Sequence, residues 1–549
     1  MVDRRIVYSA GLVLILAVAT LWNVPHRLEI RPLPADWSGT KDAAPYQLSV
    51  FPDSAIYDGD WLGVETQTDS TPGNTQLQVR LDSPNASPLV EGNLPPNRMG
   101  DFWLAQWPWI WNSTSQSGWH TLFVNPAGGS GTDPLNNATL LQYPVRILPA
   151  ALRPVLRQNT LWREAAGTCC NYYYLTGTES ERDLAELMEL TEQAYREITT
   201  RMLGSSSKLT VVFLPRLYGQ GGLADGEGVL SYMDRNATGT DFPVVLTHEM
   251  VHLVAGANFP PNRYPPAMLT EGWAVYITGG HYRTPEPLED RAAVVYQSGD
   301  YIPLATLADS FYLTQHETAY IEAGAFVEFL IDRFGWDRVY AMFRDPVSVQ
   351  PPSAALDSIL SAHLQTHLAE CESEWLGSLR ERTPDSEQVQ DVKFTVTFFD
   401  DLRRYQGLYT PGSDVSAMWI PDLPTARKRG MTADYLASPE TAESIALETM
   451  FRVAKRQAGE HNWKGAWENL DAIEQVLTAR QRRAPDPAFV SPLADGYRRL
   501  TSAVFRSGYE PLDILLESGR AEVTVRPFGG LEKGAQIWQQ TGGTWLRVE

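Results

Sequence analysis

The order of apolar and polar positions separates three regions that follow an apolar amino terminus. In the first region, short segments alternate between apolar and polar residues, with clusters of Gly, Pro, Asn and Asp between them. Alternation with a period of two is typical of half-buried strands. Since no strong helical pattern interrupts it, we expect an all-β sandwich, immunoglobulin-like in type, over residues 25–155. The clearest strand segments are residues 46–50, 76–81, 119–124 and 140–148.

The second region, residues 156–385, mixes strand and helix patterns. Strands are predicted over residues 171–175 and 208–214, with an amphipathic helix over residues 182–202 between them. A mostly apolar helix is expected over residues 243–256, where Pro243 suits the first turn and Gly256 suits the end, and a short helix follows near residues 267–278. This mixture predicts a central α+β domain.

The third region, residues 386–549, is predominantly helical. Helical patterns run through Gln481 and again over residues 492–507. Strand patterns follow over residues 521–525, 536–540 and 544–548, and the last two are joined as a hairpin. We expect a C-terminal helical domain with a small terminal β-hairpin and find no catalytic motif in it.

The segment His248-Glu249-Met250-Val251-His252 is the strongest candidate for chemistry. On a helix, residues four apart share a face, so His248 and His252 can bind one metal ion. Glu249 lies beside them, where its carboxylate can take a proton from a water molecule that the metal activates. A catalytic zinc needs three protein ligands and one open position. Glu271, in the short helix that follows, is the best third ligand.

These residues resemble the site of the gluzincin metallopeptidases, which belong to the peptidase MA-like superfamily and include thermolysin and the aminopeptidase N type. The resemblance rests on the two histidines, the glutamate between them, and Glu271 within Glu271-Gly272-Trp273-Ala274. It covers residues 165–380. It implies a zincin-like catalytic domain that holds one zinc per chain and hydrolyses a peptide or protein substrate, with Glu249 as general base. The aminopeptidase motif Gly-x-Met-Glu-Asn does not occur in the sequence, which argues against aminopeptidase activity.

The resemblance also implies further site residues. Residues 319–335 are similar to the helix that follows the site in that superfamily, and Tyr320 is the candidate donor to the oxyanion, with His316 as its substitute. In zincin folds the strand before the metal helix is the sheet edge over the cleft. The residues in this place are Gly228, Val229, Leu230, Ser231 and Tyr232. We expect them to bind an extended peptide, and a hairpin strand with no substrate role is the alternative.

The amino terminus has the features of a membrane segment. Arg4 and Arg5 precede residues 6–24, which carry no charge. A helix needs about 20 residues to cross a bilayer, which is close to the length of this segment. The positive charge before it predicts that the rest of the chain lies outside the cytoplasm. We expect residues 1–24 to be a signal-anchor that leaves the catalytic part outside the cytoplasm, as a single-pass protein of the cell membrane. A cleaved signal peptide and a secreted protein are the alternative.

The charge of the chain limits its partners. The sequence has 45 basic and 66 acidic residues, a formal net charge of −21, and no basic stripe. Such a chain is repelled by nucleic acid, which we exclude as a partner. Two function classes remain: an envelope-anchored, outward-facing zinc metallopeptidase, and a non-enzymatic envelope protein that keeps a zincin fold for binding or scaffolding. The complete set of ligands and base favours the first.

Two further patterns leave alternatives open. Three tryptophans alternate within residues 107–111, so a strand would place them on one face, either as an aromatic platform for a ligand or in the sandwich core. Cys169 and Cys170 are adjacent and would face opposite ways in a strand, so at most one of them should reach Cys371. The absence of any bridge is the other possibility.

Overall fold

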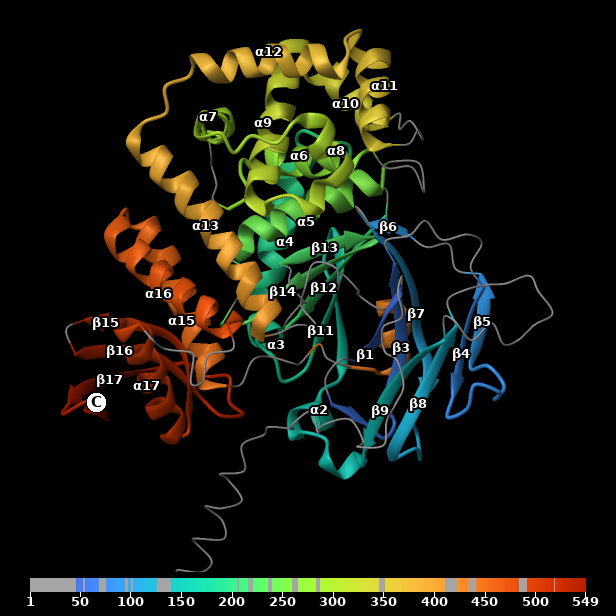
Figure 1. Ribbon diagram of the computed structural model, residues 1–549, viewed down its shortest axis with the longest axis vertical. Helices are drawn as coiled ribbons and strands as arrows, with labels where there is room; N and C mark the ends of the chain where they lie inside the picture. The colour runs from blue at the N-terminus through green and yellow to red at the C-terminus, as the bar shows by residue number, and fades with distance from the viewer. Residues whose placement is uncertain are drawn as a thin grey trace, which may run out of the picture.

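The computed structural model (Figure 1) shows an N-terminal β part, a central part of sheet and helices, and a helical C-terminal part with its own sheet. The structure describes residues 46–52, 55–68, 76–93, 97–99, 102–125, 140–204, 207–215, 221–235, 239–258, 265–282, 287–344, 351–409, 422–432, 435, 441–482, 491–517 and 519–549. The membrane segment expected over residues 1–24 lies outside these ranges. Within them, no helix is both long and apolar enough to span a bilayer.

The N-terminal part consists of two sheets, and the all-β prediction is confirmed. The first sheet has the strand order β1 (Tyr46–Phe51), β3 (Trp61–Thr68), β7 (Phe102–Asn112), β6 (Asn97–Met99). The second has the order β2 (Ile56–Tyr57), β9 (Leu141–Leu148), β8 (Gly118–Asn125), β4 (Gln76–Leu81), β5 (Val90–Asn93). Apolar side chains from both sheets, such as Val64 and Leu122, form one core. The immunoglobulin-like topology stays a prediction.

The tryptophans of β7 belong to this core. Trp107 and Trp111 are each only 7% exposed and pack with the apolar residues of both sheets. An aromatic platform is therefore wrong for these two residues, because the face of β7 that carries them is turned towards the second sheet. The side chain of Trp109 lies outside the described part of the structure.

The central sheet positions the candidate site. Its strand order is β10 (Trp162–Ala166), β11 (Cys170–Leu175), β12 (Leu209–Leu214), β14 (Glu227–Ser231), β13 (Gly222–Asp225). The three inner strands run parallel, and β10 and β13 pair antiparallel at the two ends. The inner strands are apolar at most positions because both faces of the sheet are covered.

The prediction that residues 228–232 form the sheet edge is wrong. Gly228 to Ser231 lie in β14, where Val229 pairs with Val212 of β12 on one side and with Leu223 of β13 on the other. A tight turn at Gly226, whose φ of +71° suits glycine, folds β13 back against β14. Tyr232 follows the strand and donates its hydroxyl to Asp183. The edge strand is β13, which directly precedes β14 in the sequence.

Helices cover this sheet and carry the candidate ligands. Helix α5 (Phe242–Gly256) packs on β13, β14 and α4 (Leu184–Thr199), and α6 (Ala267–Thr278) packs between α5 and α9 (His316–Phe334). Gly272 permits close contact between α6 and α9, since a Cβ atom there would lie 2.7 Å from the carbonyl carbon of Ala323. The predicted bounds of α6 are confirmed, and α5 begins at Phe242, one residue before its predicted start.

The C-terminal part is helical, and its sheet is larger than predicted. Helix α13 (Ser386–Tyr409) contacts α7 (Leu288–Ser298) and α9 of the central part and also α15 (Ala442–Gly459) and α16 (Trp463–Gln481). The expected hairpin is present as β17 (Gly534–Thr541) and β18 (Thr544–Arg547). It belongs to a four-stranded antiparallel sheet with β15 (Tyr509–Glu517) and β16 (Arg520–Pro527). The four strands together pack on α15 and α17 (Pro492–Arg506).

The following helices and turns complete the fold. They are α2 (Val155–Asn159), α3 (Glu179–Arg182), α7 (Leu288–Ser298), α8 (Leu304–Ser310), the single turns η2 (Ala150–Leu152) and η3 (Phe311–Leu313), α10 (Trp336–Arg344), α11 (Pro352–Leu364), α12 (Leu368–Glu381) and α14 (Leu423–Arg429). The predicted domain boundaries at residues 155 and 385 stay predictions.

The cysteines pair differently from both expectations. Cys169 and Cys170 form a disulfide with each other, and Cys371 is a buried free thiol. Cys169 lies in the bend before β11, and the strand begins at Cys170, so the opposite orientation of strand neighbours does not apply to this pair.

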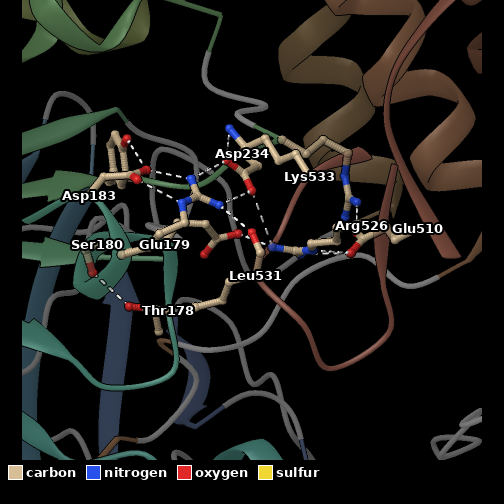
Figure 2. A network of polar contacts seen from close by, with 12 residues as sticks. Thr178, Glu179, Ser180, Asp183, Asp234, Glu510, Arg526, Leu531 and Lys533 are labelled. Atoms are coloured by element: carbon tan, nitrogen blue, oxygen red, sulfur yellow. Dashed lines mark hydrogen bonds and ion pairs between the residues drawn. The ribbon is translucent and has the colours of Figure 1, made fainter. Parts of the chain in front are cut away.

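A network of charged side chains holds the C-terminal sheet against the central part (Figure 2). Arg526 of β16 pairs with Glu179 of α3 and with Glu510, the latter at 2.8 Å. Asp234, just after β14, accepts hydrogen bonds from Arg182 at 2.8 Å and Lys533 at 2.6 Å. Because Asp234 belongs to the segment between β14 and α5, the C-terminal sheet contacts the chain directly ahead of the candidate ligands.

Candidate metal centre

Two helices bring three ligand atoms together. His248 and His252 lie one turn apart on α5, and Glu271 lies on α6. The Nε2 atoms of the two histidines are 3.1 Å apart, and Oε2 of Glu271 is 3.0 Å from the His248 nitrogen and 3.3 Å from the His252 nitrogen. All three predicted ligands therefore converge on one point.

The triangle of these three atoms has the size that zinc requires. Zinc binds histidine nitrogen and carboxylate oxygen at about 2.0–2.2 Å in a tetrahedral arrangement, which separates neighbouring ligand atoms by about 3.3 Å. The observed separations are 3.0, 3.1 and 3.3 Å. Among the described residues, this is the one group of at least three His, Cys, Asp or Glu side chains close enough to hold a metal ion. Two nitrogens and one oxygen are also a donor set that zinc favours in catalytic sites.

Burial and mutual charge set the protonation of the ligands. Burial lowers the pKa of His248 to about 4, which keeps its imidazole neutral as a metal ligand requires. Burial also disfavours charge on His252 and Glu271, but their attraction outweighs it, so the pKa of His252 is raised and that of Glu271 is well below its usual value. Glu271 is thus an ionised carboxylate that is only 7% exposed.

Glu249 lies beside the ligands and is not one of them. It is 7% exposed, and burial raises the pKa of its carboxyl to about 8, with Glu271 contributing and His252 opposing. Gly222 of the edge strand β13 lies directly against this carboxylate. A carboxylate next to a metal position, and not itself a ligand, can act as a general base towards water that the metal activates.

Two aromatic residues predicted from the sequence lie close to the ligands. The ring of Tyr320 is 6.0 Å from that of His248 and 4.9 Å from that of His316. Burial, Glu271 and Glu249 raise the pKa of Tyr320 well above its usual value, so its hydroxyl remains a donor. Burial and the charge of Arg403 hold the pKa of His316 well below its usual value, and Arg403 Nη2 donates to His316 Nδ1 at 3.4 Å. His316 is therefore neutral, with its proton on Nε2.

Three more side chains, from positions not selected in the sequence analysis, reach the centre. The hydroxyl of Tyr312, in η3, donates to Glu271 Oε1 at 2.6 Å. His281 stacks on Tyr320 with ring centroids 4.0 Å apart, and its Nδ1 contacts the buried carboxylate of Glu317 at 2.7 Å. Arg403 comes from α13, outside the region predicted to be catalytic. For His281, the one hint in the sequence is that it follows the Glu271 helix within a few residues. No local sequence feature indicates that Tyr312 or Arg403 belongs to the site.

These groups line one cavity of about 600 Å³. Its walls include the three ligands, Glu249, Tyr312, His316, Tyr320, His281 and Arg403, together with Gly222, Leu223 and Ala224 of β13. Gly228 to Tyr232, predicted to bind substrate, are not among the described residues that line it. The edge strand, the base and the metal ligands therefore share one space large enough for a short peptide segment.

No family model and no curated protein matches this chain. Among solved structures, it is similar to an M1 zinc metallopeptidase from Deinococcus radiodurans, at 14% identity over 63% of this chain and 96% of that chain, with a TM-score of 0.29. It is also similar to leukotriene A4 hydrolase from Saccharomyces cerevisiae, at 12% identity over 87% and 96% with a TM-score of 0.30, and to an aminopeptidase N family protein from Idiomarina loihiensis, at 12% identity over 73% and 78% with a TM-score of 0.26. The chemistry of this chain is inferred from the geometry of the centre itself.

Proposed function

We propose that this chain is a zinc-dependent metallopeptidase that hydrolyses peptide bonds with Glu249 as general base. The observation that carries the proposal is the triangle formed by His248 Nε2, His252 Nε2 and Glu271 Oε2 beside a buried carboxylate in one cavity. His248, His252 and Glu271 would hold the zinc ion, which would act as a Lewis acid that polarises the scissile carbonyl and acidifies water.

The residues around the ligands supply the remaining steps. Glu249 takes a proton from the attacking water and delivers it to the leaving amine, a role that its place beside the metal ligands in the same cavity allows. The Tyr320 hydroxyl donates to the negative charge that develops on the carbonyl oxygen. The edge strand β13 offers backbone groups on its outer side, with which an extended peptide can pair as a further strand.

The proposal includes the location expected from the sequence. Arg4 and Arg5 followed by the uncharged residues 6–24 support a protein anchored in the cell envelope with its catalytic part outside, or secreted after cleavage. Determining the amino-terminal residue of the mature protein, in membrane and soluble fractions, distinguishes these two forms.

Metal analysis and peptide hydrolysis test the function together. The purified chain should contain one zinc, cleave members of a mixed peptide library, lose this activity when a chelator removes the metal, and regain it when zinc is returned. A zinc-loaded chain that cleaves no peptide in the library would contradict the proposal and favour a non-enzymatic binding protein.

A further inference from the structure

The two oxygens of Glu271 have different partners. Oε2 faces both histidines, at 3.0 Å from His248 Nε2 and 3.3 Å from His252 Nε2. Oε1 accepts the hydroxyl hydrogen of Tyr312 at 2.6 Å. The carboxylate therefore presents one oxygen to the candidate metal position, while the other is engaged by a phenol.

The fold holds the Tyr312 hydroxyl in this place. Tyr312 is the middle residue of η3, the single turn between α8 and α9. Its neighbour Phe311 is 3% exposed and packs edge-on against both Tyr312 and Tyr320, with ring centroids 5.2 and 5.1 Å away. Tyr312 itself is 36% exposed at the side of the cavity. Its side chain is held in place by the buried Phe311 and by the hydrogen bond to Glu271.

A hydrogen bond to one carboxylate oxygen affects how the group binds a metal. A carboxylate can coordinate through one oxygen or through both, and a donor on Oε1 occupies a lone pair and keeps that oxygen away from the ion. Coordination through Oε2 alone leaves three protein ligands and one open position, the arrangement of a catalytic zinc site. Partners of this kind orient ligands, and their loss typically weakens metal affinity by about 10–100-fold.

We propose that Tyr312 is a positioning residue that restricts Glu271 to coordination through one oxygen and so keeps the fourth zinc position open. This inference rests on the proposed zinc site, and it concerns a residue that acts through Glu271 and need not contact substrate.

The test compares Tyr312→Phe with the wild-type full chain. Zinc affinity is measured by competition with a chromogenic chelator, and the visible absorption of the cobalt-substituted protein reports the number of ligands. Tyr312→Phe, which keeps the ring, should bind zinc about 10–100-fold more weakly. Its cobalt spectrum should lose intensity, as expected when Glu271 binds through both oxygens. Leu313→Ala, on the same turn and 43% exposed, should change neither measurement.

The outcomes separate this inference from the proposed function. Unchanged zinc affinity and an unchanged cobalt spectrum in Tyr312→Phe would overturn the inference, even if kcat fell, because the hydroxyl would then act on substrate. A wild-type chain that binds zinc but hydrolyses no peptide would refute the proposed function. The zinc affinity and the cobalt spectrum of Tyr312→Phe would still test the role of Tyr312. A wild-type chain that binds no zinc would overturn both.

Discussion

Gly222 lies so close to Glu249 that a Cβ atom on residue 222 would come within 2.7 Å of the Oε1 atom of that carboxylate. Residue 222 opens the edge strand β13, and Glu249 lies on α5, so this contact joins the strand proposed to pair with substrate to the proposed base. The absence of a side chain at residue 222 is what allows strand and carboxylate to approach.

Gly222→Ala should therefore displace the Glu249 carboxylate. A displacement of about 1 Å in a catalytic group can lower kcat about 100-fold. Zinc content should stay unchanged, because the three atoms nearest to the added Cβ all belong to Glu249, which is not a ligand. Gly256→Ala is the matched control: it also lines the cavity, but a Cβ atom there would meet nothing within 4 Å. Equal kcat in the two variants would show that the contact has no role in aligning the base.

Glu249→Gln should separate metal binding from catalysis. The amide occupies the same space but cannot accept the proton of water, so hydrolysis should fall by about two to four orders of magnitude. Zinc content, measured by mass spectrometry of the metal, should remain at one per chain since Glu249 is not a ligand. Cleavage at the wild-type rate would mean that another group acts as base.

Removal of either histidine ligand should abolish zinc binding. His248→Ala or His252→Ala leaves two protein ligands, which rarely retain a catalytic zinc. Glu271→Gln should weaken binding, because a neutral amide is a poorer ligand than a carboxylate. Metal content after dialysis is the measurement. A His248→Ala/His252→Ala double variant that still held one zinc per chain would refute the proposed centre.

Tyr320→Phe tests the proposed oxyanion donor. Loss of one such donor typically costs about 3 kcal/mol of transition-state stabilisation, so kcat should fall roughly 100-fold while zinc content is unchanged. His316→Ala is the comparison, because the proton on its Nε2 makes it the other available donor in the same cavity. An unchanged kcat in Tyr320→Phe beside a large decrease in His316→Ala would transfer the role to His316.

Glu322 should make stability fall as pH rises. It lies on α9 with no solvent exposure, and burial raises its pKa well above the usual value despite the hydrogen bond from the Ile302 amide at 3.0 Å. Above pH 4.5, the ordinary value for this group, the folded chain retains a proton that the unfolded chain has lost. The free energy of unfolding therefore decreases with pH, by about 1.4 kcal/mol per unit, until the raised pKa is passed.

Glu322→Gln should remove this contribution and raise the urea midpoint more at pH 8 than at pH 5. The amide oxygen can still accept from Ile302, so the packing is preserved. Glu374→Gln, a half-exposed glutamate on α12, is the control and should leave the pH dependence as in the wild type. Parallel pH profiles for wild type and Glu322→Gln would show that Glu322 is not the source.

The sequence by itself determined the elements whose cause is local. The spacing of His248 and His252 predicts a shared helix face. The apolar periodicity, with Pro at helix starts and Gly at a helix end, predicts the bounds of α5 and α6 to within one residue. The N-terminal strands followed from alternation of period two. In each case the information lies within a few turns or one strand, so no knowledge of distant contacts was needed.

Only the tertiary structure decided which segments meet. Whether β13 or β14 is the edge depends on strand pairing, which the apolar pattern of β14 does not reveal, since a strand buried on both faces looks the same at an edge or inside. Tyr312 and Arg403 reach the cavity from η3 and α13 through the packing of α8, α9 and α13, at no fixed distance along the chain from the ligands. The bond between Cys169 and Cys170 depends on a bend before β11. Local patterns specify elements, whereas contacts between elements are set by the summed packing of side chains far apart in sequence.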